Sequence, residues 1–316
     1  MRRDARIYVA GAETLIGASL LRALDRQGYT QLLGKAGDGP TLTDAQQVEA
    51  FFANAAPEYV FLVAGKSGGI QANQRYPADL IRENLLVECH VIQSAARHRV
   101  NALLYLASSC CYPKHCPQPM QESALLTGAL EPTSEPYAIA KIAGITLCQA
   151  YRRQHRVSFL VGIPGDVFGP GDDFSLEDSH VVPALIRKMH DAKVRGDEAV
   201  VLWGTGTPRR EFLYADDLAE ACLFVLQHYD RPDPINLGGG SVLSIRELAE
   251  LVKDVVGYAG RLQFDTSKPD GMPAKWLDAT TLSGLGWRPR TSLRSALTAT
   301  YAWFLQEQRT DAVVVH

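Results

Sequence analysis

Cysteine is scarce and scattered in this 316-residue sequence, and no two of the six cysteines form a CxxC pair. No Cys/His grouping has metal-site spacing, so neither a zinc domain nor a disulfide scaffold is expected. Neither charge sign is in excess, because 32 Lys and Arg stand against 35 Asp and Glu. No apolar run approaches the ~20 residues that span a bilayer, and no signal-peptide core precedes the first strand-like run. These absences predict a reduced, cytoplasmic protein that binds no metal, nucleic acid or membrane.

What the sequence does contain is typical of a globular enzyme-sized chain. Hydrophobic residues make up 46% and charged residues 21%, and the length corresponds to about two domains at ~150 residues each. The helical patterns around Cys89, Cys148 and Cys222 predict buried, apolar roles for these thiols.

Strand-like and helix-like patterns alternate through the first half. The expected strands cover 6–10, 29–33, 59–64, 102–106 and 158–162, and the expected helices 18–27, 45–53, 84–97 and 137–152. This alternation predicts an α/β fold with a doubly wound parallel Rossmann sheet. We expect a dinucleotide-binding domain over 1–165, with 210–238 packing back on it. A smaller α/β substrate domain is expected over 166–209 and 239–316.

A glycine-bounded turn, Gly11 to Gly17, joins the first strand to the first helix. Backbone N–H groups and the helix dipole at such a turn can hold a dinucleotide pyrophosphate. The same residues also fit an ordinary strand–helix turn. The position in the first βα unit favours a cofactor.

Tyr137 and Lys141 are four residues apart and share one face of a predicted helix. A nearby ammonium favours tyrosinate, so we expect the pKa of Tyr137 to be lowered. Ser108 follows the fourth strand, where ligands bind in open α/β sheets, and its hydroxyl can bond a carbonyl oxygen held by Tyr137.

Other candidates are ambiguous from spacing alone. Cys110 could act as a thiolate base, but the segment Ser108 to Cys111 also fits a polar turn with one buried thiol. His180, at an expected helix start, fits either an acid/base or a capping residue.

The second half of the chain adds cations beside tryptophans. Arg209 and Arg210 follow Trp203. The arginines suit a phosphate and the tryptophan suits the face of a sugar or base. The alternative is a solvated arginine pair beside a core Trp. Lys275 beside Trp276 allows the same two interpretations, a ligand contact or a solvated cation beside a core Trp.

Several longer stretches resemble one family. They are Lys66-Ser-Gly-Gly-Ile, Tyr76-Pro-Ala-Asp, Ser108-Ser-Cys, Glu131-Pro-Thr-Ser-Glu-Pro-Tyr-Ala-Ile-Ala-Lys-Ile-Ala-Gly, Ser179-His-Val-Val-Pro-Ala-Leu, Trp203-Gly-Thr-Gly-Thr-Pro, Arg210-Glu-Phe-Leu and Ser267-Lys-Pro-Asp-Gly. Over about residues 5 to 308 the chain resembles the GDP-L-fucose synthases, which are GDP-4-keto-6-deoxy-D-mannose 3,5-epimerase/4-reductases of the extended short-chain dehydrogenase/reductase type.

The resemblance implies roles for individual residues. Tyr137 would be the acid of the reduction, supported by Ser108 and Lys141, and Cys110 and His180 the base/acid pair of the epimerisation. The expected GDP-keto-sugar contacts are Arg187, Lys188, Trp203, Arg210 and Lys275. The expected cofactor is NADP(H), with NAD(H) as the open alternative. Its expected contacts are Gly11, Glu13, Thr14, Leu15, Ile16, Gly17, Lys35, Ala64, Lys141, Pro164 and His180.

The sequence departs from the family pattern at three places. Thr14 replaces the middle glycine of the turn, which leaves less room for backbone approach. Glu13 stands where an Arg commonly contacts the cofactor 2′-phosphate, and a carboxylate would repel that phosphate, although Lys35 could offset it. Gly165-Asp166 replaces a Thr-Asn pair, and an ionised Asp166 near a pyrophosphate would be unfavourable.

Three alternative functions stay open. The first is a sister epimerase/reductase for another GDP-keto-sugar, such as a dideoxy or heptose sugar. The second is a pure 4-reductase, and the third a non-catalytic dinucleotide-binding sensor. The resemblance also implies a homodimer through helices near 84–97 and 137–152.

Overall fold

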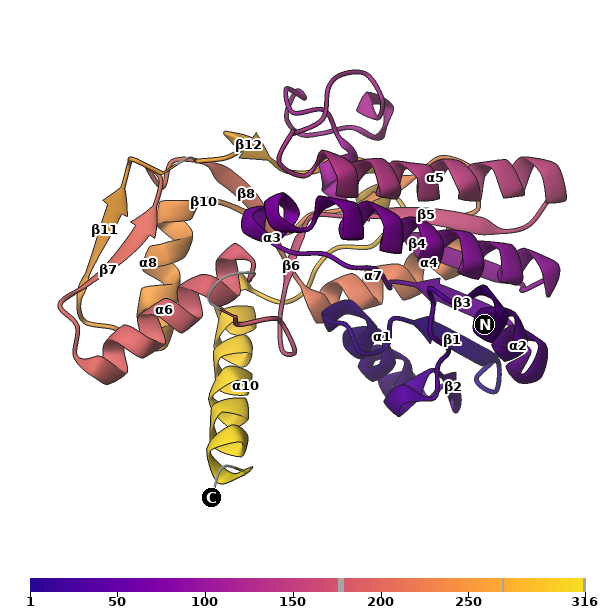
Figure 1. Ribbon diagram of the computed structural model, residues 1–316, viewed down its shortest axis with the longest axis horizontal. Helices are drawn as coiled ribbons and strands as arrows, with labels where there is room; N and C mark the ends of the chain where they lie inside the picture. The colour runs from indigo at the N-terminus through magenta and orange to yellow at the C-terminus, as the bar shows by residue number, and fades with distance from the viewer. Residues whose placement is uncertain (176–178, 269, 315–316) are drawn as a thin grey trace.

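A computed structural model describes residues 1–175, 179–268 and 270–314 (Figure 1). One unit of the fold holds a six-stranded, wholly parallel sheet in the order β2-β1-β3-β4-β5-β9. The strands are β1 (Arg6–Ala10), β2 (Gln31–Leu33), β3 (Tyr59–Leu62), β4 (Ala102–Leu106), β5 (Phe159–Pro164) and β9 (Ile235–Leu237). The predicted doubly wound Rossmann sheet is confirmed.

Helices cover both faces of this sheet. One face carries α1 (Leu15–Arg26), α7 (Ala215–His228) and α9 (Thr280–Gly284), and the other carries α2 (Ala45–Ala55), α4 (Pro77–Arg97) and α5 (Glu135–His155). Strands that are buried on both faces read as continuous apolar runs, as β3 and β4 do.

The remaining elements form a second unit, at the left of Figure 1. Strand β8 (Arg209–Tyr214) pairs with β10 (Ser241–Ser244), β12 (Ala274–Lys275) and β6 (Asp166–Phe168), while β7 (Ala199–Trp203) pairs with β11 (Arg261–Asp265). Helices α6 (Val181–Arg195), α8 (Ile245–Val256) and α10 (Leu293–Val314) supply its core. The short elements α3 (Ile70–Arg75), η1 (Lys35–Gly37), η2 (Ser109–Cys111) and η3 (Glu122–Ala124) complete the fold. Within the described residues, no helix has the length and apolarity needed to cross a membrane.

Several boundaries differ from the sequence expectations. The first helix begins at Leu15 instead of residue 18, because the Thr14 side chain caps it. Helix α4 begins at Pro77, well before residue 84, because proline is favoured in the first turn of a helix. The prediction for Cys89 was wrong: it lies on the exposed side of α4, whereas Cys148 and Cys222 are buried as expected.

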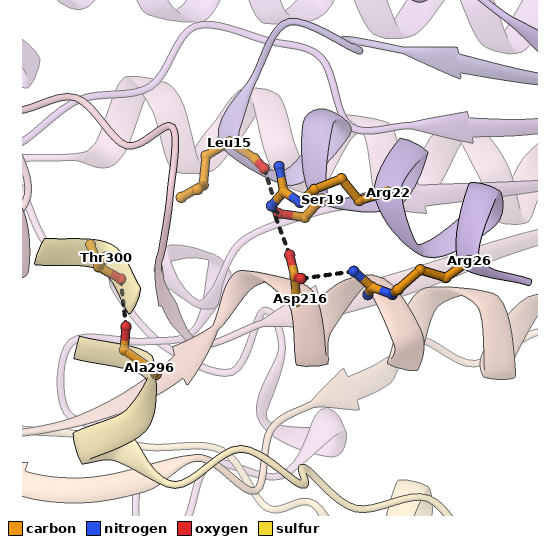
Figure 2. Close-up of polar contacts among 7 residues, drawn as sticks. All are labelled: Leu15, Ser19, Arg22, Arg26, Asp216, Ala296 and Thr300. Atoms are coloured by element: carbon orange, nitrogen blue, oxygen red, sulfur yellow. Dashed lines mark hydrogen bonds and ion pairs between the residues drawn. The ribbon is translucent and has the colours of Figure 1, made fainter. Parts of the chain in front are cut away.

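Two carboxylates join segments that are distant in the sequence. Figure 2 shows Asp216, in the first turn of α7, bound by Arg22 at 2.7 Å and Arg26 at 3.1 Å from α1. Glu211 on β8 is only 2% exposed. It accepts hydrogen bonds from the backbone N–H groups of Gly239, Gly240 and Leu277, at 2.5, 2.8 and 2.9 Å. Glu211 therefore ties the chain that leaves β9 to the second sheet.

We expect Glu211→Ala to be destabilising, because it leaves the buried Leu277 N–H and the more exposed N–H groups of Gly239 and Gly240 without their acceptor. An unsatisfied buried donor costs ~1–3 kcal/mol, whereas water can replace the acceptor at the exposed donors, so the free energy of unfolding should fall by about 1–3 kcal/mol. Urea denaturation followed by circular dichroism measures this loss.

Two further variants make that measurement specific. Glu211→Gln keeps one acceptor oxygen and should lose less, and Glu250→Ala, on the exposed face of α8, should leave the midpoint unchanged. A Glu211→Ala midpoint equal to that of Glu250→Ala would contradict the bridging role.

Candidate active site

The glycine turn between β1 and α1 is closely packed. Gly11 has a φ of +99°, and a Cβ there would lie 2.7 Å from the Ala64 Cα at the end of β3. A Cβ on Gly17 would collide with the Gly11 carbonyl. Thr14 Oγ1 donates to that carbonyl at 2.7 Å and accepts from the Gly17 N–H at 3.1 Å. Thr14 therefore builds the turn from its side chain where the family pattern has a glycine.

This turn fits the pyrophosphate of a dinucleotide. The first N–H groups of a helix have no acceptor within it and carry its positive dipole end, so those of Leu15 and Ile16 suit an anion. Glu13 is exposed beside them, and Lys35, just after β2, bonds Asp25 at 3.1 Å on α1. Ala64 and Pro164 lie at the carboxyl ends of β3 and β5, at the edge where open α/β sheets bind ligands.

Ser108 and Tyr137 meet beyond the end of β4. Ser108 caps the short helix η2 by accepting from the Cys110 N–H at 3.2 Å, and its side chain also hydrogen-bonds the Tyr137 phenol. The pKa of Tyr137 is raised above its ordinary value, chiefly because burial disfavours the phenolate and also because Cys110 and Cys111 lie nearby. The expectation of a lowered Tyr137 pKa was therefore wrong for this structure.

The Lys141 ammonium explains part of that outcome. Its Nζ is 5.9 Å from the centroid of the Tyr137 ring, but only 3.3 Å from Glu88 Oε1 and 3.4 Å from the Leu106 carbonyl. Much of its charge is therefore balanced by Glu88. Glu88 was not predicted as a site residue. It lies four residues after Asn84 on the buried face of α4, and that spacing of two polar residues was a usable signal.

The structure distinguishes the two adjacent thiols. Cys111 is buried with its Sγ 3.9 Å from the Ala138 carbonyl, and burial raises its pKa to about 12. Cys110 is only half-buried, and of the two it is the thiol that a ligand can reach.

A second group of side chains comes from the other unit. Lys275 Nζ lies 2.6 Å from Asp166 Oδ1, and both the Asp166 carboxylate and Cys110 are close enough to act electrostatically on Lys275 and Arg210. Burial lowers the pKa of Arg210. The structure thus brings Cys110 and the Asp166–Lys275 pair to one place.

His180 belongs to the same group. It is the N-cap residue of α6 and is exposed to solvent, although the protein around it removes part of its hydration. This desolvation lowers the pKa of His180, Asp166 counteracts the effect, and Lys275 adds to it. The proton affinity of the imidazole thus depends on both members of the Asp166–Lys275 pair.

The remaining candidates lie on β7, α6 and β8. The Trp203 side chain is 52% exposed, which rules out a core role, and the ammonium groups of Lys188 and Lys268 lie 5.9 and 5.5 Å from its ring centroid. Arg187 bonds Asp191 at 2.8 Å one turn along α6. Arg209 turns toward Glu247 at 3.5 Å, so the two adjacent arginines are not equivalent.

Comparison with protein families gives a consistent result. The model of the NAD dependent epimerase/dehydratase family matches residues 7–238. The chain is 53% identical over 304 residues to GDP-L-fucose synthase 1 of Arabidopsis thaliana, which covers 96% of this chain and 94% of the relative.

Solved structures agree. A GDP-6-OMe-4-keto-L-xylo-heptose reductase from C. jejuni is 31% identical with a TM-score of 0.92, covering 97% of this chain and 99% of the other. A GDP-L-fucose synthetase from Naegleria fowleri bound to NADP is 26% identical with a TM-score of 0.90, covering 98% and 97%.

The charges around His180 predict opposite effects for two substitutions. Asp166→Asn removes the carboxylate that favours the imidazolium, so the pKa of His180 should fall further. Lys275→Met removes a cation that disfavours the imidazolium, so this pKa should rise. An NMR titration of the His180 ring signal, assigned with His180→Asn, measures both without any assay of activity.

A distant substitution controls for general changes in net charge. Asp254→Asn, on the exposed face of α8, should leave the His180 titration unchanged. Shifts of the same sign in Asp166→Asn and Lys275→Met would contradict the proposed electrostatic arrangement.

Proposed function

Because the chain belongs to the NAD dependent epimerase/dehydratase family, and within it to the GDP-L-fucose synthases, we propose that one site performs both of their reactions. The substrate is a GDP-4-keto-6-deoxyhexose, which is epimerised at C3 and C5 and then reduced at C4 with NADPH. The observation that carries this proposal is the meeting of Ser108, Tyr137 and Cys110 with the Asp166–Lys275 pair beside His180.

The epimerisation needs a base and an acid around an acidified carbon. The C4 ketone acidifies the C–H bonds at C3 and C5. Cys110 removes a proton there to give an enolate, and His180 returns a proton to the opposite face. Ser108 and Tyr137 hydrogen-bond the oxyanion that develops at O4.

The reduction uses the same oxygen. Bound NADPH supplies the hydride. Tyr137 then donates its proton to O4, and Ser108 keeps that oxygen within its reach. The raised pKa of Tyr137 suits this role, because it keeps the phenol protonated and ready to donate. Both reactions develop negative charge on one oxygen, which is why one set of hydrogen-bond donors serves both.

The residues that would hold the cofactor follow from the same geometry. We propose that the α1 N-terminus, with Thr14, Leu15 and Ile16, binds the pyrophosphate, and that Lys141 bonds the ribose next to the nicotinamide. Lys35 would face the 2′-phosphate of NADP(H) and offset the repulsion from Glu13.

The second unit would bind the nucleotide-sugar. Trp203, with one indole face available, suits stacking on the base or the sugar, while Lys188 and Arg210 suit the diphosphate. Arg187, paired with Asp191, would act at the rim of this site. Asp166 is neutralised by Lys275, so it does not present an unpaired charge to the substrate.

The alternative functions differ in which of the candidate catalytic side chains they require. A pure 4-reductase needs neither Cys110 nor His180 as a proton carrier, and a sensor needs no reactive group at all. A sister enzyme for another GDP-keto-sugar keeps the same acid/base set. The heptose reductase of C. jejuni, at 31% identity, makes it the second candidate. Turnover of a panel of GDP-4-keto-sugars with NADPH and NADH decides among them.

Cys110→Ser should separate the two reactions. Removing the base should reduce solvent deuterium uptake at C3 and C5 by about 100-fold or more, since general bases contribute 10²–10⁴-fold. Tyr137→Phe should instead reduce NADPH oxidation by a similar factor. Mass spectrometry of the product and absorbance at 340 nm follow the two steps.

Cys116→Ser is the matched control, because this thiol is also half-buried but lies outside the site. It should retain both activities. Deuterium uptake at the wild-type rate in Cys110→Ser would show that another group is the base.

We infer that two copies associate in the cytoplasm through the outer sides of α4 and α5. These two helices pack together, and each has an exposed apolar or thiol side chain: Ile139 on α5 is 44% exposed, and Cys89 on α4 is exposed. An apolar side chain on the outer side of a long helix is what a helix–helix interface uses.

A charge at this surface should separate the copies. Ile139→Glu should sediment as a monomer, whereas the wild type should sediment at twice the chain mass, in analytical ultracentrifugation at micromolar concentration. Val194→Glu, on the exposed side of α6, is the control and should remain dimeric. A monomeric wild type would contradict the dimer.

A further inference from the structure

A buried carboxylate, that of Glu88, lies next to the ammonium of the Tyr137–Lys141 pair. Glu88 on α4 and Lys141 on α5 leave only 2% and 5% of their side chains exposed, and their charged atoms are 3.3 Å apart. They occupy the space between α4 and α5, under the carboxyl end of β4. Nothing in the two reactions proposed above uses Glu88.

The surrounding residues shape a place for this carboxylate. Tyr105, fully buried on β4, donates its hydroxyl to Glu88 Oε1 at 2.6 Å and lies 3.3 Å from the Lys141 carbonyl. Gly144, one turn after Lys141, makes this possible, because a Cβ there would lie 2.5 Å from the Tyr105 hydroxyl. Glu88 Oε2 has no hydrogen-bond partner among the described residues.

Such a pair is expensive to bury. Removing two charges from water costs more than their attraction returns unless the geometry is excellent, and apolar residues of the same volume are often as stable or more so. Stability alone therefore does not account for Glu88. Its carboxylate lies 3.3 Å from the Lys141 Nζ, which is itself 5.9 Å from the Tyr137 ring centroid, and this position points to a chemical role.

We propose that Glu88 is a positioning residue that fixes the Lys141 ammonium and balances part of its charge, so that Tyr137 stays a proton donor over the working pH range. This inference rests on the proposed function, because it concerns the acid of the 4-keto reduction. Without Glu88, the full positive field of Lys141 would act on the phenol and favour tyrosinate.

Several titratable groups face the Glu88–Lys141 pair from the neighbouring elements, and the charge of Glu88 raises the pKa of the buried ones. They are Tyr105 from β4, Cys110 and Cys111 from η2, and Tyr137 and Cys148 from α5. The negative charge of Glu88 raises the pKa of each buried phenol and thiol among them, Tyr137 included. Burial raises the pKa of Glu88, and among the described residues Lys141 is the cation that counteracts this and favours the carboxylate.

Glu88→Gln tests the proposal, because it removes the charge and keeps the shape. The pH dependence of the turnover number for NADPH-dependent reduction should keep its form, but its alkaline limb should move to lower pH by about one unit. One unit corresponds to a tenfold change in the proton affinity of the phenol. Thermal denaturation of the variant confirms that it is folded.

Two variants keep the test decisive. Tyr105→Phe removes a hydrogen bond of Glu88 but leaves its charge, so the alkaline limb should stay at the wild-type pH. Glu88→Asp keeps the charge but withdraws it by one methylene, so it should show a smaller shift of the same sign even where Glu88→Gln does not fold. A merely structural role would lower activity in all three variants without moving the limb, and that result would overturn the proposal.

A second readout separates this inference from the proposed function. The absorbance of tyrosinate near 295 nm is titrated in the NADP⁺-loaded protein, and the contribution of Tyr137 is the difference from the matching Tyr137→Phe variant. If the wild type reduces no GDP-4-keto-sugar, the proposed function fails, and a lowered Tyr137 midpoint in Glu88→Gln still supports the role of Glu88. Equal midpoints in the wild type and in folded Glu88→Gln would overturn it.

Discussion

The buried ammonium of Lys141 is the charge on which the rest of the site depends. It lies between the Leu106 carbonyl, the Glu88 carboxylate and the Tyr137 ring, and these three groups come from β4, α4 and α5. A cation in this position can exist only if the protein surrounds it with acceptors. The packing of α4 against α5 and the identity of Gly144 follow from that requirement as much as from apolar contact, because Glu88 and Tyr105 need the space between these elements.

Much of the fold follows from the sequence pattern, and the reasons are physical. The strand at 102–106 is apolar throughout because helices cover both faces of a parallel sheet, so its type and direction are readable without a structure. His180 was placed correctly at a helix start, where it is the N-cap residue of α6. The boundaries of α1 and α4 were not readable, because a side-chain cap and a first-turn proline extend these helices beyond their apolar pattern.

The electrostatics of the candidate site could not be predicted in the same way. Spacing alone places Lys141 beside Tyr137, but it does not reveal that the Glu88 carboxylate lies 3.3 Å from the ammonium, whose distance to the Tyr137 ring centroid is 5.9 Å. Likewise, Asp166 looked unfavourable next to a pyrophosphate, and its partner Lys275 lies more than a hundred residues away in the chain. In both cases the sign of the local field depends on a residue brought in by tertiary structure, which a local pattern does not contain.

The two units of the chain supply different charge arrangements to the site. From the second unit, Lys275 and Asp166 form a close ion pair beside Arg210 and the Cys110 thiol, so positive and negative charge meet there. From the first unit, the burial of Tyr137 and the negative charge of Glu88 raise the pKa of the phenol and keep it protonated. The protonation of Tyr137 is therefore set by residues of the sheet and its helices, and not by the charged groups of the second unit.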